Sequence, residues 1–144
     1  MSILRDERLV ALHDLVEACR ASASHCDLVA EAMAEDSRAE ALQALAGQRN
    51  READFFGARM AAEDDIPEGP PEERSLLQAA LARGKAALAE DGEDALLADC
   101  RAREEEVLNR AEAARDAPLR DDEKAAAAAL AEDARRRLDG LFKL

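Results

Sequence analysis

The chain has 144 residues with a formal net charge of −13, and 48% of its residues are hydrophobic although only 2% are aromatic. A core built from Leu, Ala, Val and Met suits closely packed helices rather than sheets. The 20 Lys and Arg residues form no single basic face. Because phosphate binding draws its affinity from clustered cations, we expect neither nucleic acid nor a membrane surface as a partner.

The sequence has no obvious targeting or membrane-spanning segment. No apolar run approaches the ~20 residues that cross a bilayer, and the charged start MSILRDERLV lacks a signal-peptide apolar segment. Three cysteines without a CxxC spacing are typical of reduced thiols in a reducing compartment. We therefore expect a cytoplasmic protein with one domain over residues 1–144.

Apolar residues recur at steps of three and four, which predicts amphipathic helices. The first stripe consists of Leu9, Leu12, Val16, Cys19, Ala23, Cys26, Ala30 and Met33. Ser37 and Glu40 have the spacing of a capping box, and Gly140 is placed to form a left-handed cap. The run DDIPEGPP, residues 64–71, cannot continue a helix. Five helices are predicted, over about 3–35, 37–63, 71–90, 93–115 and 118–139.

The short connection between the first two predicted helices favours an antiparallel hairpin. If the shorter helix over 71–90 is a crossover, the other four helices form two hairpins joined by one long connection. This is the ferritin-like topology. We predict an all-α, ferritin-like four-helix bundle with a crossover helix, and a five-helix up-and-down bundle is the alternative.

Four segments also carry a resemblance to a known family: LVEACRASA, ALAGQRNREADFF, ALARGKAAL and DCRAREEEVLNRAEAA. They are similar to a bacterial ferritin-like family of unknown function, the PA-type bundle proteins, and distantly to YciF-like and rubrerythrin-like bundles. The resemblance implies a ferritin-like fold. The family's recurring polar positions match Gln48, Arg49, Arg83 and Glu104, whereas His25 and Ala111 stand where a Tyr is common.

Two of the apolar stripes contain a charged residue. Glu104 lies on the stripe Leu97, Cys100, Glu104, Val107, Ala111 and Ala114, and Arg49 lies between Leu45 and Ala53 on the stripe of the second helix. A buried carboxylate must be paired, bound to a metal or protonated. We predict a structural ion pair between Arg49 and Glu104 that fixes helix register, joined by Glu52 or Gln48. Alternatively, a slight rotation brings Glu104 to the bundle edge.

A di-iron site in such a bundle requires Glu-x-x-His motifs. Val10 precedes His13 and Ser22 precedes His25 at that spacing, so neither histidine completes the motif. We therefore expect no catalytic residue, metal or cofactor. The alternative is a degenerate site for iron or another divalent metal, with Glu17, Glu52 and Glu104 as ligands. His13 and Glu17 lie off the apolar stripe, which favours a surface pair.

The three cysteines, Cys19, Cys26 and Cys100, lie on the predicted stripes. We expect them to pack as small apolar side chains, and a soft-metal site is the alternative. Two functional classes remain. One is a non-catalytic bundle that forms a homo-oligomer or binds a protein partner, in which the alanine-rich helix over 118–139 accepts another helix closely. The other is a degenerate metal or redox bundle.

Overall fold

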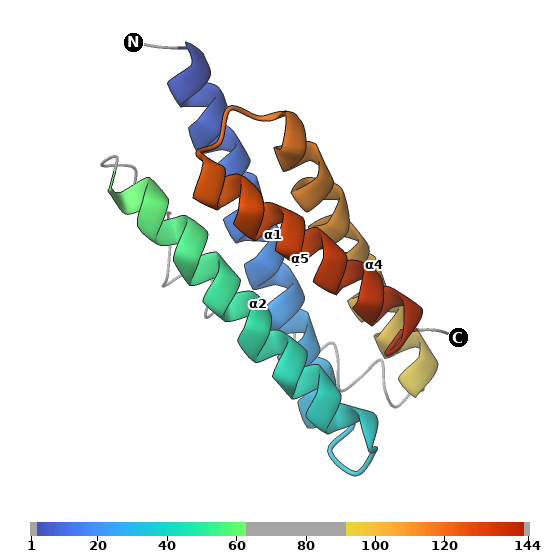
Figure 1. Ribbon diagram of the computed structural model, residues 1–144. Coiled ribbons are helices and arrows are strands. Elements are labelled where there is room, and N and C mark those ends of the chain that lie inside the picture. Colours follow the sequence, from blue (N-terminus) through green and yellow to red (C-terminus); the bar gives the residue numbers. More distant parts are fainter. Residues whose placement is uncertain (1–2, 63–91, 143–144) are drawn as a thin grey trace.

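The computed structural model describes residues 3–62 and 92–142, and these residues are all-helical (Figure 1). They form α1 (Ile3–Ala32), α2 (Arg38–Ala61), α4 (Glu93–Ala113) and α5 (Asp121–Asp139), with the short 3-10 turn η1 (Ala114–Asp116) after α4. The all-α prediction is confirmed for the described residues. The helix expected over 71–90, the proline-rich run 64–71 and Arg83 lie outside them.

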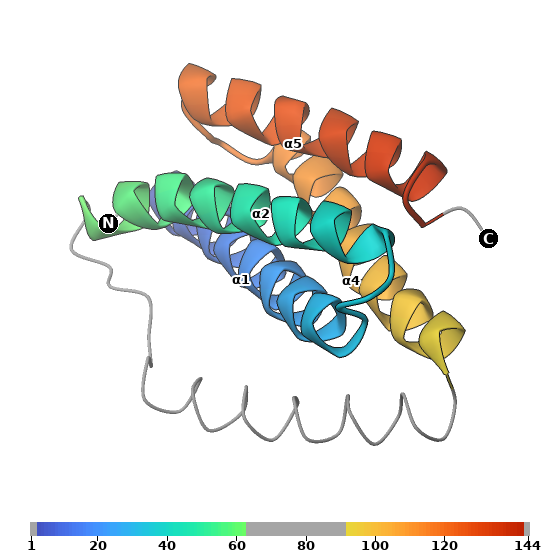
Figure 2. The same cartoon turned by 90° about the horizontal axis from the view of Figure 1, so that it is seen from below.

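The four helices lie side by side as two antiparallel hairpins (Figures 1 and 2). Helix α1 packs against α2 and α4, and α4 packs against α5. Helix α5 also lies beside α2, where the ion pairs Arg49–Asp133 and Arg59–Asp122 join the two helices. Helices α2 and α4 run in the same direction, opposite to α1 and α5.

The predicted apolar stripes form the core. All positions of the α1 stripe are buried, as are the stripe residues of α2 and α4. In α5 the buried stripe residues are Ala127, Leu130 and Ala134, whereas Leu138 and Leu141 are half-buried. The low aromatic content is therefore compatible with a packed interior, because small residues let the helices approach closely.

The core is divided into two apolar clusters. The first lies toward the start of α1 and includes Leu12, Phe56, Val107 and Leu130. The second lies toward the end of α1 and includes Cys26, Leu42, Leu97, Cys100 and Phe142. Buried polar side chains occupy the interior between them, and they form the candidate site described below.

The helix ends differ from two of the predictions. Ser37 makes no side-chain capping hydrogen bond, so the predicted capping box is wrong. The Asp36 carboxylate instead accepts a hydrogen bond from the Arg38 backbone N–H at 2.8 Å. Gly140 has φ −103° and is not left-handed, whereas Gly92, before α4, has φ 80°, a conformation that glycine adopts without steric cost.

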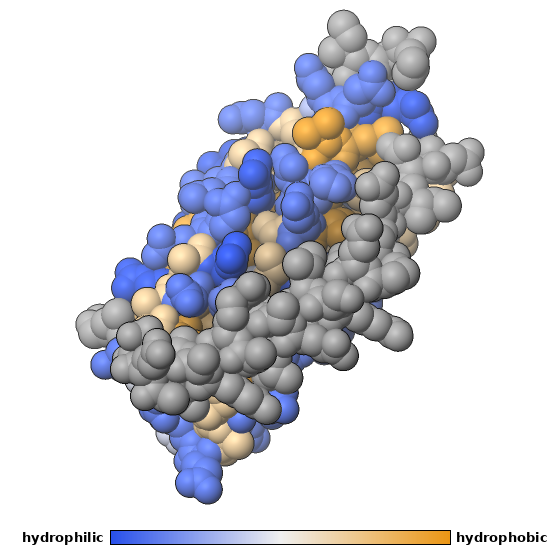
Figure 3. All heavy atoms as spheres, turned by 180° about the vertical axis from the view of Figure 1, so that it is seen from behind, coloured by the Kyte–Doolittle hydropathy of each residue, from blue (hydrophilic) through white to orange (hydrophobic). Residues whose placement is uncertain are grey.

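The surface is consistent with the acidic composition. The face shown in Figure 3 is mainly hydrophilic, with a small hydrophobic spot near the end of the bundle where α1 begins. Val10 is the exposed large hydrophobic residue of the described chain. Among the helices of residues 3–62 and 92–142, none combines the length and apolar character required to cross a membrane.

Candidate functional site: a buried polar layer

Arg49 of α2 and Glu104 of α4 meet in the middle of the bundle. The Arg49 guanidinium donates two hydrogen bonds to the carboxylate, from Nε to Oε1 at 2.9 Å and from Nη2 to Oε2 at 2.5 Å. Both side chains are fully buried. The alternative in which Glu104 rotates to the bundle edge does not hold, because its carboxylate lies inside.

Three further side chains complete what we call the polar layer, defined as Ser22, Arg49, Glu52, Glu104 and Asp133. Ser22 of α1 donates to Glu104 Oε1 at 3.0 Å, and Arg49 Nη1 donates to Glu52 Oε1 at 2.6 Å. Asp133 of α5 places Oδ2 2.9 Å from Arg49 Nη2, as an ion pair without hydrogen-bond geometry. The polar layer therefore joins all four described helices.

Gln48 lies at the edge of this layer, and its side chain forms hydrogen bonds with Glu52 and Arg51. Its amide donates to Glu52 Oε2 at 3.2 Å. Its carbonyl oxygen accepts from the exposed Arg51 at 2.8 Å. Gln48 thus holds Glu52 from the solvent side.

The polar layer contains three carboxylates and one guanidinium, so its net charge is zero only when two arginines at its solvent edge, Arg136 and Arg137, are counted. Glu52, Glu104 and Asp133 surround one guanidinium, and Asp133 also lies 2.6 Å from Arg136 and 3.6 Å from Arg137. Burial disfavours a charged Arg49, but the hydrogen bonds and charge of Glu104 outweigh burial and raise the pKa of Arg49. Arg49 therefore stays a fixed cation.

This arrangement suits structural pairing better than acid–base or metal chemistry. An arginine does not give up its proton in proteins, so it cannot act as a general acid or base. The two carboxylates that face it most closely, Glu52 and Glu104, have their inward oxygens engaged by the guanidinium. A metal ion bound by these oxygens would have to displace the guanidinium.

Of the three alternative metal ligands of the sequence analysis, the structure brings Glu52 and Glu104 together around Arg49 but leaves Glu17 apart from them. Glu52 and Glu104 share Arg49, whereas the Glu17 side chain is 73% exposed and lies beside His13 on the outside of α1. Among the residues that the structure describes, one group of three acidic, histidine or cysteine side chains has its ligand atoms close enough together to hold a metal ion: His13, Asp14 and Glu17.

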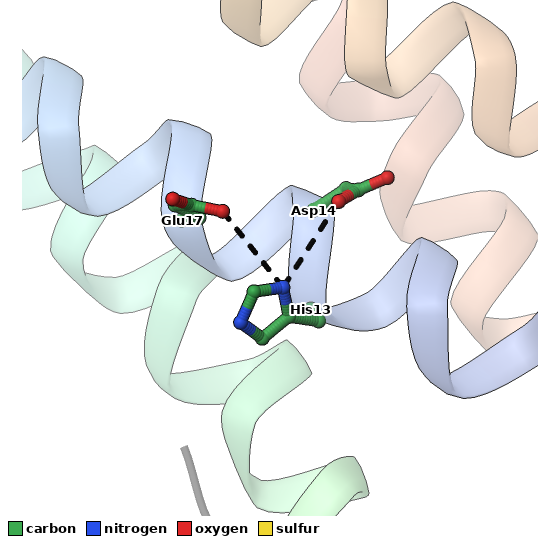
Figure 4. A group of neighbouring side chains, drawn as sticks. All are labelled: His13, Asp14 and Glu17. Carbon is green, nitrogen blue, oxygen red and sulfur yellow. Dashed lines mark ion pairs between the residues drawn. The ribbon is translucent and has the colours of Figure 1, made fainter. Parts of the chain in front are cut away.

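His13, Asp14 and Glu17 lie on a single helix at the surface (Figure 4). His13 Nδ1 is 4.0 Å from Asp14 Oδ1 and 3.8 Å from Glu17 Oε2. Arg110 of α4 lies 3.3 Å from the other oxygen of Asp14. The surface-pair interpretation of His13 and Glu17 agrees with this exposure.

A second buried ion pair, between Arg8 and Glu123, was not foreseen from the sequence. Arg8 donates from Nε to Glu123 Oε1 at 2.9 Å and from Nη2 to Oε2 at 2.6 Å. The backbone N–H of Arg120 also donates to Glu123, at 2.9 Å. Glu123 lies four residues before Ala127 on the α5 stripe, so extending that stripe backwards would have found it.

The three cysteines are all buried and free. Burial, followed by the charge of Glu52, raises the pKa of Cys19 to about 12. The pKa of Cys100 is raised, first by its interaction with the Cys26 side chain and then by burial. The prediction of small buried side chains is confirmed, and no third ligand joins Cys26 and Cys100 among the described residues.

His25 lies next to the cysteine pair and is half-buried. Its pKa is lowered, first by burial and then by the charge of Arg103, although Asp99 opposes the shift.

Comparisons of this chain with protein-family models, with curated proteins and with solved structures found no match.

Proposed function

We propose that this chain is a non-catalytic, ferritin-like helical bundle that acts through its surface by forming a homo-oligomer. The observation that carries the proposal is the buried Arg49, which binds the carboxylates from which a bundle of this kind would build a metal site. A cation supplied by the protein itself stabilises these carboxylates without metal or redox chemistry.

The ferritin-like part of the proposal is supported by helix direction and by sequence. Helices α2 and α4 run in the same direction, as expected if a long connection returns the chain to the other end of the bundle. The segments that resemble the bacterial ferritin-like family include Arg49 and Glu104, which are the two residues at the centre of the polar layer.

The outer face of α5 is the surface that we assign to self-association. Its exposed centre consists of the small residues Ala125, Ala128 and Ala129, which permit close helix–helix approach. Its N-terminal end carries the acidic residues Asp121 and Asp122, and its C-terminal end carries the exposed Glu132, Arg135 and Arg136. Within the chain Asp122 pairs with Arg59, Arg135 with Glu112 and Arg136 with Asp133.

This face is complementary to itself in an antiparallel arrangement. When two α5 helices cross between Ala128 and Ala129, the acidic end of one faces the arginine end of the other. A two-fold axis thereby forms each charge contact twice. Like-directed helices would instead bring equal charges together, so the antiparallel pairing is favoured.

Size-exclusion chromatography with light scattering tests this proposal. We expect the wild-type chain to have twice the mass of one chain of 15.6 kDa, and Ala128→Glu to shift it to the monomer. Ala102→Glu is the matched control, because Ala102 is exposed on α4 and the substitution adds the same charge. A wild-type monomer at all concentrations, or equal effects of the two variants, would contradict the proposal.

The competing function is a degenerate metal or redox bundle, favoured by the convergence of Glu52, Glu104 and Asp133 on one cation. Elemental analysis of the purified protein separates the two functions. Iron, manganese or zinc at one or more ions per chain, lost in Glu104→Ala, would support the metal bundle and overturn a purely structural role for the polar layer.

A further inference from the structure

Cys26 of α1 and Cys100 of α4 face each other across the bundle. A hydrogen bond of 3.0 Å joins Ser22 and Glu104. Cys26 lies four residues after Ser22 in α1, and Cys100 lies four residues before Glu104 in α4. Because α1 and α4 are antiparallel, moving four residues forward in α1 and four residues back in α4 leads to two positions that again lie opposite each other. Residues four apart lie on one face of a helix. The two thiols therefore lie opposite each other within the same apolar cluster.

The surroundings of the two thiols are apolar. Both cysteines belong to the second cluster, whose other members include Ala23, Ala30 and Leu97. Cys26 and Cys100 are each fully buried. Neither thiol therefore has water to solvate a thiolate.

Cys19 provides a natural comparison within the same chain. It is also fully buried, but it belongs to the first cluster, on the other side of the polar layer. Seven residues separate Cys19 from Cys26 along α1, a rise of about 10 Å. Cys19 is thus a buried thiol without a thiol partner.

The apolar surroundings favour one kind of chemistry for the facing pair. A soft metal ion such as Cu(I) bound by two thiolates would leave a net negative charge in the second cluster, and an unpaired buried charge is costly. A disulfide is neutral and needs no counterion. Charge therefore favours bond formation between the two sulfurs over metal binding.

We propose that Cys26 and Cys100 are a redox modification site, which hydrogen peroxide oxidises to an intramolecular disulfide between α1 and α4. One sulfur attacks an oxygen of the peroxide, the O–O bond breaks, and a sulfenic acid forms with release of water. The second sulfur then attacks the sulfenic sulfur, so that the S–S bond forms and the S–O bond breaks. The two thiols are oxidised, the peroxide is reduced, and the thiol protons leave in two molecules of water.

Burial determines the rate and the selectivity of this reaction. Because the thiolate is the nucleophile and apolar burial disfavours it, oxidation proceeds through local opening of the helices. The reaction is therefore as slow as that opening, and hydrogen peroxide, which is small and neutral, needs a smaller opening than a large or charged oxidant to reach the sulfurs. This proposal does not depend on the proposed self-association, because the two cysteines lie inside one chain.

Mass spectrometry of the native protein tests the inference. The reduced chain is incubated with hydrogen peroxide over hours, then denatured in the presence of N-ethylmaleimide. We expect loss of two hydrogens and labelling of only one of the three cysteines, and peptide mapping should join Cys26 to Cys100. Dithiothreitol should restore labelling of all three.

Cysteine variants supply the controls. Cys19→Ala should still form the bond and then show no labelled cysteine, whereas Cys26→Ala and Cys100→Ala should form none. The Cys19→Ala result stands even if the other two variants fail to fold. Three outcomes would overturn the inference: a bond that involves Cys19, a bond between chains, or sulfur oxidation of the native protein without a Cys26–Cys100 bond.

Discussion

The bundle contains two buried arginine–glutamate pairs, and they differ in how far their surroundings share the charge. The Arg49–Glu104 pair lies between the two apolar clusters and contacts all four described helices. The Arg8–Glu123 pair joins α1 to α5 near the start of both helices, and Arg59 of α2 lies 4.0 Å from the same carboxylate. Both are bidentate, so the difference lies in position rather than in pair geometry.

Position determines what each pair contributes. A charged pair inside a bundle repays its desolvation only when every donor and acceptor is engaged, and it then favours one helix register over others. Ser22 and Glu52 add hydrogen bonds to the central pair, whereas Asp133 adds only its charge, because its buried Oδ2 has no hydrogen-bond partner among the described residues. The backbone N–H of Arg120, just before α5, also donates a hydrogen bond to Glu123. This bond links the Arg8–Glu123 pair to the first turn of α5.

The largest expected effect follows from removing the central cation. Arg49→Met leaves Glu52, Glu104 and Asp133 close together without their shared counterion, and we expect a loss of about 4 kcal/mol in unfolding free energy. Glu104→Gln removes one charge but retains an acceptor, and about 3 kcal/mol is expected. Urea unfolding followed by circular dichroism measures both losses.

Glu105→Gln is the matched control for the central pair. Glu105 is the next residue of α4, but it is exposed and pairs with Arg101 across one helical turn at 3.0 Å. Exposed pairs of this kind contribute about 0.5 kcal/mol or less. An equal loss in Glu104→Gln and Glu105→Gln would show that the central pair does not stabilise the bundle.

Much of the central site could be predicted because its charges interrupt regular apolar stripes. Arg49 stands between Leu45 and Ala53, and Glu104 stands between Cys100 and Val107. Because these apolar neighbours are buried, the charged side chains on the same helix stripe are buried with them. Ser22 and Arg8 were missed because the buried face of α1 is wider than one stripe. A second series through Arg8, Leu12, Leu15, Cys19, Ser22 and Cys26 is also buried.

Other features could not be obtained from spacing alone. Asp133 lies at the edge of the α5 stripe, and only the packing of α5 against α2 brings it to Arg49. The predicted side-chain cap of α2 is wrong because Asp36 and Ser37 are both good capping residues. Which one caps depends on where α1 ends, and α1 ends at Ala32 rather than near residue 35.

An intermediate effect is expected for the Arg8–Glu123 pair. Glu123→Gln removes the carboxylate charge that Arg8 binds, and we expect a loss of about 2 kcal/mol at neutral pH, because removing one member of a buried pair is destabilising. The smaller value reflects its position near the end of the helices. A loss as large as that of Glu104→Gln would contradict the difference drawn between the two pairs.

The same pair predicts a dependence on pH. Burial would raise the pKa of Glu123, but hydrogen bonds from Arg8 and from the Arg120 backbone outweigh it and lower the pKa below the ordinary 4.5. The unfolded chain then binds the proton more readily, so the stabilisation is present above pH 4.5 and is lost as the pH falls through the folded pKa. The difference between wild type and Glu123→Gln should therefore shrink in acid. A constant difference would contradict this assignment.

The smallest expected effect concerns Ser22, which ties α1 to the polar layer. Ser22→Ala removes the hydroxyl that donates to Glu104 Oε1, and hydrogen bonds to charged groups contribute about 1.5–3 kcal/mol. Because Arg49 still engages both oxygens of Glu104, we expect about 1 kcal/mol from urea unfolding. In the Glu104→Gln background the same substitution should cost less, since the acceptor is no longer charged. Equal costs in both backgrounds would mean that Ser22 stabilises α1 by packing, and that the polar layer joins three helices rather than four.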